Sequence, residues 1–220
     1  MDTTALDLLS RSIWPLARGA LAATIPLTLA SFAIGLVIAI LIALARLSES
    51  RILRGLAGVY VSLIRGTPLL VQLFVIFYAL PQLGVVIDPF PSAILAFSLN
   101  VGGYTAETIR AAILSVPTGQ WEAAETIGLD RATTLRRVIA PQALRVAVPP
   151  LFNTFIGLVK DTSLASSIMV SELLREAQII AAPSYRFLLL YSLAALYYWL
   201  ICAVLAIVQS RIEKKLEARS

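Results

Sequence analysis

The 220-residue chain is 59% hydrophobic, only 14% of its residues are charged, and its formal net charge is +5. Soluble domains carry about 25% charged residues, so one soluble core cannot hold this many apolar side chains and some must face lipid. The chain has one cysteine, Cys202, and no histidine, which excludes an internal disulfide and argues against a metal site or histidine-based catalysis.

Long uncharged apolar runs predict membrane spans. The runs at 19–45, 66–87 and 187–210 each exceed the ~18 apolar residues that mark a spanning helix, and two further runs are interrupted by charges. We expect an all-α polytopic membrane protein with about five transmembrane helices. The expected spans are 19–45, 61–80, 92–114, 146–168 and 187–210.

The ends of the chain differ from this transmembrane domain. Residues 1–18 contain charges and no short apolar core with a small-residue cleavage site, so they do not resemble a signal peptide. We expect an outer or interfacial tail at 1–18, a single transmembrane domain at 19–210 and a basic cytoplasmic tail at 211–220.

The distribution of Lys and Arg predicts the orientation. The connections at 46–60 and 115–145 and the tail after residue 210 hold most of the basic residues outside the spans. Basic residues are enriched in cytoplasmic loops, so the N-terminus is expected outside and the C-terminus in the cytoplasm. The basic character is therefore a topology signal, and we expect no nucleic-acid partner.

Two connections carry local signals. Residues 65–68, Arg-Gly-Thr-Pro, interrupt the approach to the second span. They form either irregular backbone facing protein or a watery cavity, or a simple helix start with Pro68 in its first turn. Arg65 is expected near the inner mouth. The outer connection at 166–186 contains a mixed stretch, 171–180, that predicts an interfacial helix lying on the outer surface.

The connection at 115–145 predicts two short helices separated by a glycine turn. Thr118 is placed to cap the first helix, and Gly128 to end it. Asp130 is placed to cap the second helix, and Pro141 to end it. We expect this helical pair to lie at the inner face of the membrane.

One face of the first short helix is suited to docking. Trp121, Ala124 and Ile127 share one side of it, and the small side chains of Ala123 and Ala124 permit a close approach by another surface. Two alternatives are a loop that packs only on its own bundle and a DNA-binding helix-turn-helix. The membrane spans that closely flank the loop argue against DNA binding.

Glu122-Ala123-Ala124, followed by Gly128 and then Pro141, resembles the EAA loop of ABC importer permeases. One difference is Ala140, where that family has leucine. In the family this loop is the coupling helix, which sits in a cleft on the ATP-binding subunit. The resemblance therefore implies an ATPase-coupling role for Trp121, Glu122, Ala123, Ala124 and Gly128.

Four segments in chain order resemble the polar amino acid permeases, which serve histidine, arginine, glutamine, glutamate, opines and cystine. These segments are 65–72, 107–113, 119–124 and 158–164, and the stretches 80–84 and 91–93 look most like cystine permeases. The resemblance implies the permease subunit of an importer in the bacterial inner membrane. Its implied partners are an ATP-binding subunit, a second permease copy or a sibling permease, an extracytoplasmic solute-binding protein and membrane lipid.

Charges inside the expected spans predict where the substrate binds. Glu107 and Arg110 share one face of the third span, whereas Lys160 and Asp161 point ~100° apart on the fourth. Both signs suit a zwitterionic amino acid, although Glu107 can instead pair with Lys160 or Arg110 to hold helices together. The resemblance places the pocket around these groups. The expected substrate-binding residues are Gly66, Thr67, Pro68, Asn100, Tyr104, Glu107, Arg110, Lys160, Asp161 and Ser163.

The sequence contains no glycine-rich phosphate loop with Lys-Ser/Thr, so we expect no ATPase site and no enzyme activity in this chain. ATP is expected on the partner subunit, and no cofactor on this chain. Two alternatives remain. An ion-gradient-driven amino acid transporter would show an internal inverted repeat, which is not visible here. A non-transporting membrane scaffold subunit would not depend on the intramembrane charges.

Overall fold

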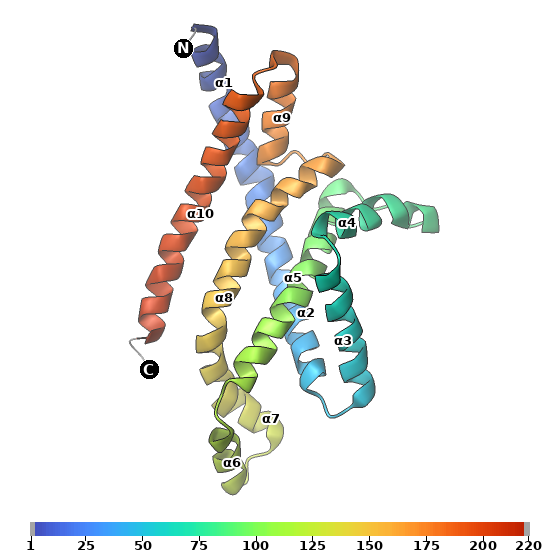
Figure 1. Cartoon of the computed structure of the whole chain (residues 1–220), viewed down its shortest axis with the longest axis vertical. Coiled ribbons are helices and arrows are strands. Elements are labelled where there is room, and N and C mark those ends of the chain that lie inside the picture. The colour runs from blue at the N-terminus through green and yellow to red at the C-terminus, as the bar shows by residue number, and fades with distance from the viewer. Residues whose placement is uncertain (1–2, 218–220) are drawn as a thin grey trace.

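The computed structural model describes residues 3–217, and within this range every regular element is helical. Figure 1 shows long helices running side by side along the long axis, with a short helical loop protruding at the lower end. The expected all-α fold is confirmed.

The first membrane-crossing element is longer than predicted. α1 (Thr3–Gly19) continues through a π-helical turn at Ala20–Thr24 into α2 (Ile25–Leu47). In the π turn the N–H of Ile25 donates to the carbonyl of Ala20, five residues back. This wider turn precedes Pro26, which has no N–H to donate, so the helix continues past the proline. The described part of the 1–18 tail is thus helical and belongs to the first long helix; residues 1 and 2 lie outside the described range.

The second span is broken. α3 (Arg51–Gly66) meets the helical segment Leu69–Leu83, which begins with α4 (Leu69–Phe74), at an angle of 106°. Thr67 and Pro68 are both extended, and Pro68 has φ −64° and ψ 139°. The predicted second span, 61–80, is therefore not one continuous helix, and of the two options for residues 65–68 the irregular backbone is the one found. α4 extends sideways from the bundle in Figure 1, and a π turn at Val75–Ala79 and a 3₁₀ turn at Leu80–Leu83 follow it.

α5 (Pro89–Leu114) lies at the centre of the bundle and agrees with the predicted third span. The packing between α5 and α2 is more extensive than the packing between any other pair of described elements. A Cβ atom at Gly102 would lie 2.6 Å from Ile38 Cγ2, and one at Gly35 would lie 2.7 Å from Val101 Cβ. Glycine at both positions lets the two backbones approach closely, as small residues do between membrane helices.

The connection after α5 contains α6 (Thr118–Thr126) and α7 (Arg131–Thr134). A π turn at Leu135–Ile139 joins α7 to α8 (Ala140–Asp161), which ends in a 3₁₀ segment at Thr162–Ile168. The prediction that Pro141 ends the second short helix is wrong. The N–H of Ala140 donates to the carbonyl of Leu135, so the wider turn places Pro141 at the start of α8, where its missing N–H is tolerated.

The outer connection forms α9 (Leu173–Ser184), and α10 (Phe187–Glu217) completes the fold. α9 packs against α1 and α10, with Leu173, Ala177 and Ala181 buried. Figure 1 shows α9 running alongside these two helices, so the predicted helix at 171–180 exists but does not lie flat on the outer surface.

Within residues 3–217, three continuous helical stretches are long and apolar enough to cross a membrane: Ala5–Leu47, Arg131–Ile168 and Phe187–Leu216. The bent pair of α3 and α4 is a fourth candidate. α5 has 26 residues and is long enough to cross, although it is less apolar than the others. The expected total of about five spans corresponds to these four candidates together with α5.

Candidate substrate and coupling sites

The break between α3 and α4 is held by one side chain, Gln72. Its amide nitrogen donates to the carbonyl of Ile64 at 2.8 Å, the carbonyl of Thr67 at 3.1 Å and the hydroxyl of Thr67 at 2.9 Å. Its amide oxygen accepts from the side-chain nitrogen of Asn100 on α5 at 3.0 Å. The non-helical backbone at Gly66–Pro68 is thus supported by protein groups, as irregular backbone at membrane depth requires.

A second contact between the broken span and α5 is made by Arg65 of α3 and Tyr104. The Arg65 guanidinium carbon lies 5.7 Å from the centre of the Tyr104 ring, within the range of a cation–π interaction. Both residues are exposed, and Tyr104 keeps 44% of its surface accessible. Tyr104, predicted to bind substrate, therefore presents part of its ring to the surface of the chain.

Glu107 is the centre of an ionic cluster between α2 and α5. Its Oε2 accepts from Arg110 at 2.9 and 2.7 Å, and its Oε1 accepts from Arg46 at 3.3 Å. The Glu107 side chain is 17% exposed, and those of Arg46 and Arg110 are about 30% exposed. Of the two partners considered from sequence, Arg110 is the one found; among the described residues Lys160 makes no ion pair with Glu107.

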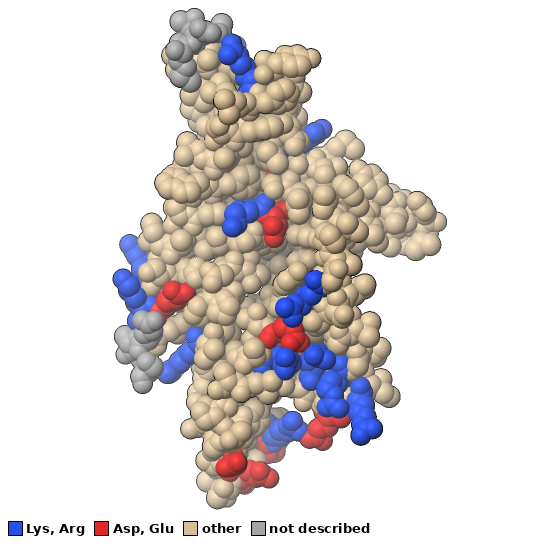
Figure 2. All heavy atoms as spheres, in the orientation of Figure 1, with Lys and Arg blue, Asp and Glu red and all other residues tan. Residues whose placement is uncertain are grey.

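Lys160 and Asp161 end α8, and Ser163 follows in the 3₁₀ segment. The side chains of Lys160 and Asp161 are exposed, while their neighbours Val159 and Thr162 are buried. α8 and the 3₁₀ segment both pack against α5, which carries Glu107 and Asn100. Figure 2 shows positive and negative side chains side by side near the middle of the face turned to the viewer and again toward its lower end.

The two short helices form the protruding loop at the lower end of Figure 1. Gly128 ends the first helix as predicted: its φ is +77°, and its N–H donates to the carbonyl of Glu125 at 2.9 Å. Asp130 caps the second as predicted, accepting from the N–H of Thr133 at 2.9 Å. Hydrogen bonding by Thr133, first through its side chain and then through this N–H, lowers the pKa of the Asp130 carboxyl. The predicted Thr118 cap is wrong, because Thr118 is the first helical residue and makes no side-chain cap bond.

The predicted docking face of this loop is partly packed against the chain itself. Ala124 is buried, and Trp121 packs against the cluster formed by the ends of α5 and α8. Ile127 is 75% exposed, and Glu122 and Ala123 are exposed beside it. The aromatic side chain is thus used for packing within the chain, and the exposed residues of the loop include Glu122, Ala123 and Ile127.

A cavity of about 1080 Å³ separates this loop from the turn between α2 and α3. Trp121 and Glu122 line one side of it and Leu47 and Ser48 the other. An ion pair between Arg131 and Glu49 links the loop to that turn. The loop is therefore attached to the bundle at its base and by this ion pair.

Two residues at these sites were not predicted as site residues, Arg46 and Gln72. Arg46 was assigned only to the inner loop that follows the first span, and the sequence does not show that it reaches Glu107 on another helix. Gln72 follows the glycine–proline break by a few residues, so its polarity within an apolar run was the available signal.

Comparison with known proteins agrees with this architecture. Residues 35–218 match the family described as binding-protein-dependent transport system inner membrane component. The chain is 58% identical over 212 residues to the L-cystine transport system permease protein TcyB of Bacillus subtilis, covering 96% of this chain and 91% of that protein. It is 40% identical over 212 residues to the glutamine transport system permease protein GlnP of Escherichia coli, covering 94% and 96%.

Solved structures show the same fold. A crystal structure of an amino acid ABC transporter with histidines superposes with a TM-score of 0.90 at 34% identity, covering 98% of this chain and 100% of that chain. The inward-facing MetNI methionine ABC transporter has a TM-score of 0.72 at 21% identity, a likeness of fold alone. The chain therefore belongs to the family of inner-membrane components of binding-protein-dependent transport systems, and it is an amino acid permease of the ABC transporter type.

Proposed function

We propose that this chain is the membrane-spanning subunit of an ATP-driven importer that carries cystine, or a closely similar polar amino acid, into the cytoplasm. The 58% identity to a permease named for L-cystine transport supports the substrate. Other relatives named for glutamine transport are 40% identical or less, so they support only the broader class of polar amino acids.

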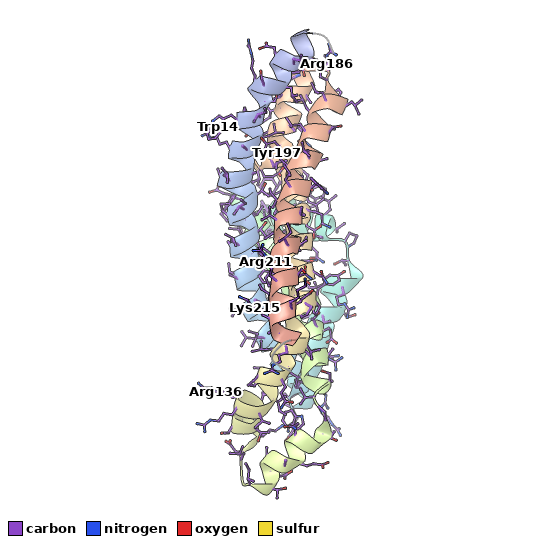
Figure 3. The ribbon with its side chains drawn as sticks, turned by 90° about the vertical axis from the view of Figure 1, so that its left-hand side faces the viewer. Trp14, Arg136, Arg186, Tyr197, Arg211 and Lys215 are labelled. Carbon is purple, nitrogen blue, oxygen red and sulfur yellow. The ribbon has the colours of Figure 1, made fainter. Side chains whose placement is uncertain are left out.

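The proposed orientation places the N-terminus outside and the end of α10 in the cytoplasm. Figure 3 shows Arg136 and Lys215 in the lower half of the molecule, Arg211 near its middle and Arg186 at its upper end. The turn between α2 and α3 and the loop of α6 and α7 also lie at the lower end. Because cytoplasmic loops are enriched in Lys and Arg, the lower end is proposed to face the cytoplasm of a bacterial inner membrane.

The observation that carries the proposed substrate site is the placement of opposite charges beside a broken span. Glu107 sits between two arginines on α2 and α5, and the Lys160–Asp161 pair ends α8, which packs against α5. An amino acid needs an anion for its ammonium and a cation for its carboxylate. We assign the ammonium to Asp161 and Glu107, and the carboxylate to Lys160 and Arg110. The backbone at Gly66–Pro68, with Asn100, Tyr104 and Ser163, supplies further polar contacts.

The energy source in this proposal is a separate ATP-binding subunit. Glu122, Ala123 and Ile127 belong to the exposed part of the protruding loop, and we assign the contact with the partner to them. ATP is bound by that partner and not by this chain. A second copy of this chain or a sibling permease would complete the conduit, a solute-binding protein would deliver the amino acid from outside, and lipid would cover the remaining apolar surface.

The test is uptake of radiolabelled cystine by cells that lack their own cystine uptake and express this chain with the ATPase and binding protein from its own genome. Uptake that requires all three proteins supports the proposal. Competition by a tenfold excess of unlabelled cystine, glutamine or histidine ranks the substrates. Uptake of none of these amino acids, with the complex assembled in the membrane, would overturn the proposed function.

A further inference from the structure

An apolar groove, lined by none of the proposed substrate residues, lies between α2, α8 and α10. Its volume is about 430 Å³, and Leu29, Val159 and Val204 each line it from a different helix. The only polar side chain in the lining is that of Thr28, whose hydroxyl donates to the carbonyl of Thr24 at 2.8 Å. The lining side chains therefore offer no charge and no free donor to a zwitterionic amino acid, but they suit a hydrocarbon chain.

A second apolar groove continues toward the lower end of the molecule. Its volume is about 260 Å³, and it shares Phe155 with the first groove. Val148 and Phe152 also line it, and they lie nearer the start of α8, which is the lower end of this helix in Figure 1. The two grooves together follow about three turns of α8.

The face of α10 beside the first groove changes from apolar to cationic along the helix. Leu200 and Val204 line the groove and are 47% and 61% exposed. At about 100° per residue, Arg211 and Lys215 each lie within about 20° of Val204 around the helix axis. Figure 3 shows both basic residues on α10, with Lys215 nearer the lower end. One stripe of α10 therefore carries groove-lining side chains above and two cations below.

No acid of the chain neutralises the two cations of this stripe. Arg211 and Lys215 are exposed, and neither forms an ion pair with any residue that the structure describes. The acid between them in sequence, Glu213, lies about 180° around the helix from Val204 and accepts from Gln209 at 2.9 Å. The stripe is thus open to an anion from outside the chain.

The spacing along α10 matches one leaflet of a membrane. At about 1.5 Å per residue, Arg211 lies about 16 Å below Leu200. Half of the ~30 Å hydrocarbon thickness of a bilayer is about 15 Å. With the groove at the centre of the bilayer, the two cations lie at the level of the lipid phosphates.

We propose that this groove and stripe bind one anionic phospholipid of the cytoplasmic leaflet, with an acyl chain in the groove and the phosphate at Arg211 and Lys215. The general enrichment of basic residues on the cytoplasmic side explains their presence but not their alignment below an apolar groove. An anionic headgroup complements the two cations, and the acyl chain complements the apolar lining. The choice of leaflet rests on the orientation given under the proposed function.

The charge of the site is tested by native mass spectrometry of the purified permease complex, titrated with phosphatidylglycerol in detergent. We expect Lys215→Gln to raise the Kd of the bound lipid about fivefold and the double variant Arg211→Gln/Lys215→Gln about 30-fold. Lys214→Gln is the matched control, because it removes the same charge about 100° away around the helix. Its Kd should change less than about twofold. Equal weakening by Lys214→Gln and Lys215→Gln would show only general charge attraction and would overturn the site.

The groove is tested by a substitution that leaves the charge unchanged. Val204→Trp fills the groove and should raise the Kd about tenfold, whereas Ala206→Trp, exposed on the opposite side of α10, should not. Phosphatidylcholine should bind at least about tenfold more weakly than phosphatidylglycerol, because it carries no net charge. Equal binding of the two lipids would contradict the inference, and so would competition by glycerol phosphate, which has the phosphate and no acyl chain.

A second copy of this chain is the other candidate occupant of the groove. Cys202 is the only cysteine, so Cys202→Ser with Val204→Cys places a single thiol at the groove. After oxidation of the assembled complex, this chain should run as a monomer on a non-reducing gel. A disulfide-linked dimer would place a second copy in the groove and overturn the inference. Lipid binding is measured without transport, so a failure of cystine uptake would overturn the proposed function alone.

Discussion

The side-chain amide of Asn100 donates to the side-chain carbonyl of Gln72 at 3.0 Å, and Gln72 donates in turn to oxygens on both sides of the α3–α4 break. The two residues come from the broken second span and the central helix. Their contact fixes the direction of α4 relative to α5, and with it the backbone at Gly66–Pro68 that is proposed to face the substrate.

We therefore expect the replacement of Gln72 by leucine to reduce uptake strongly while the chain still folds. The substitution leaves the carbonyls of Ile64 and Thr67 without their donor, at about 1–3 kcal/mol for each unsatisfied buried group. We expect uptake to fall at least about tenfold and the thermal unfolding midpoint of the complex to fall by several degrees. Leu70→Ala, in the same helix and only partly buried, is the control. Normal uptake by Gln72→Leu would show that the break needs no such support.

Glu107→Gln tests the ionic cluster. The substitution keeps the shape of the side chain but leaves Arg46 and Arg110 without a carboxylate. We expect a large loss of uptake, of about tenfold or more, with the complex still assembled, because a site for an ammonium group loses its negative charge. Arg46→Gln removes a partner of Glu107 that is not a proposed substrate contact. If both variants lose uptake equally, Glu107 acts by holding α2 against α5 and does not bind substrate.

The fold class and the main helices follow from sequence because long apolar runs have few alternatives in a membrane. The bends were harder to predict. For the break at Gly66–Pro68 the sequence left two options open. Which of them forms depends on the contact between Gln72 and Asn100, and these two residues are far apart in sequence. The π turns before Pro26 and Pro141 keep helices continuous where proline alone predicts an end. Contacts between helices, such as Arg46 with Glu107, leave no periodic pattern and appear only in the folded chain.

The protruding loop should lose its partner when its exposed surface changes. Ile127→Asp and Glu122→Lys alter exposed side chains of the loop. We expect both to weaken co-purification of the ATP-binding subunit, or to separate ATP hydrolysis from uptake, without changing the amount of this chain in the membrane. Gly128→Asp should act similarly, because a residue with a side chain is strained at φ +77°. Full co-purification and coupled hydrolysis in all three variants would mean that the partner docks elsewhere.

The close packing of α2 on α5 predicts a strong effect of size at Gly102. Valine there would meet Ile38 and the Tyr60 hydroxyl at less than normal contact distance. We expect Gly102→Val to destabilise the chain by about 1–3 kcal/mol, the usual cost of overpacking, and to lower its yield in detergent. Gly55→Ala, on the exposed side of α3 with no atom within 4 Å of the added Cβ, should be neutral or slightly stabilising. Equal thermal stability of the two variants would contradict the observed helix contact.

The most direct test of the whole mechanism is uptake of labelled cystine into proteoliposomes that contain the purified permease–ATPase complex and its binding protein. ATP inside the vesicles should drive accumulation, a proton or sodium gradient alone should not, and Asp161→Asn should abolish accumulation while leaving the complex assembled. Accumulation driven by an ion gradient in the absence of ATP, or full ATP-driven uptake by Asp161→Asn, would contradict the mechanism.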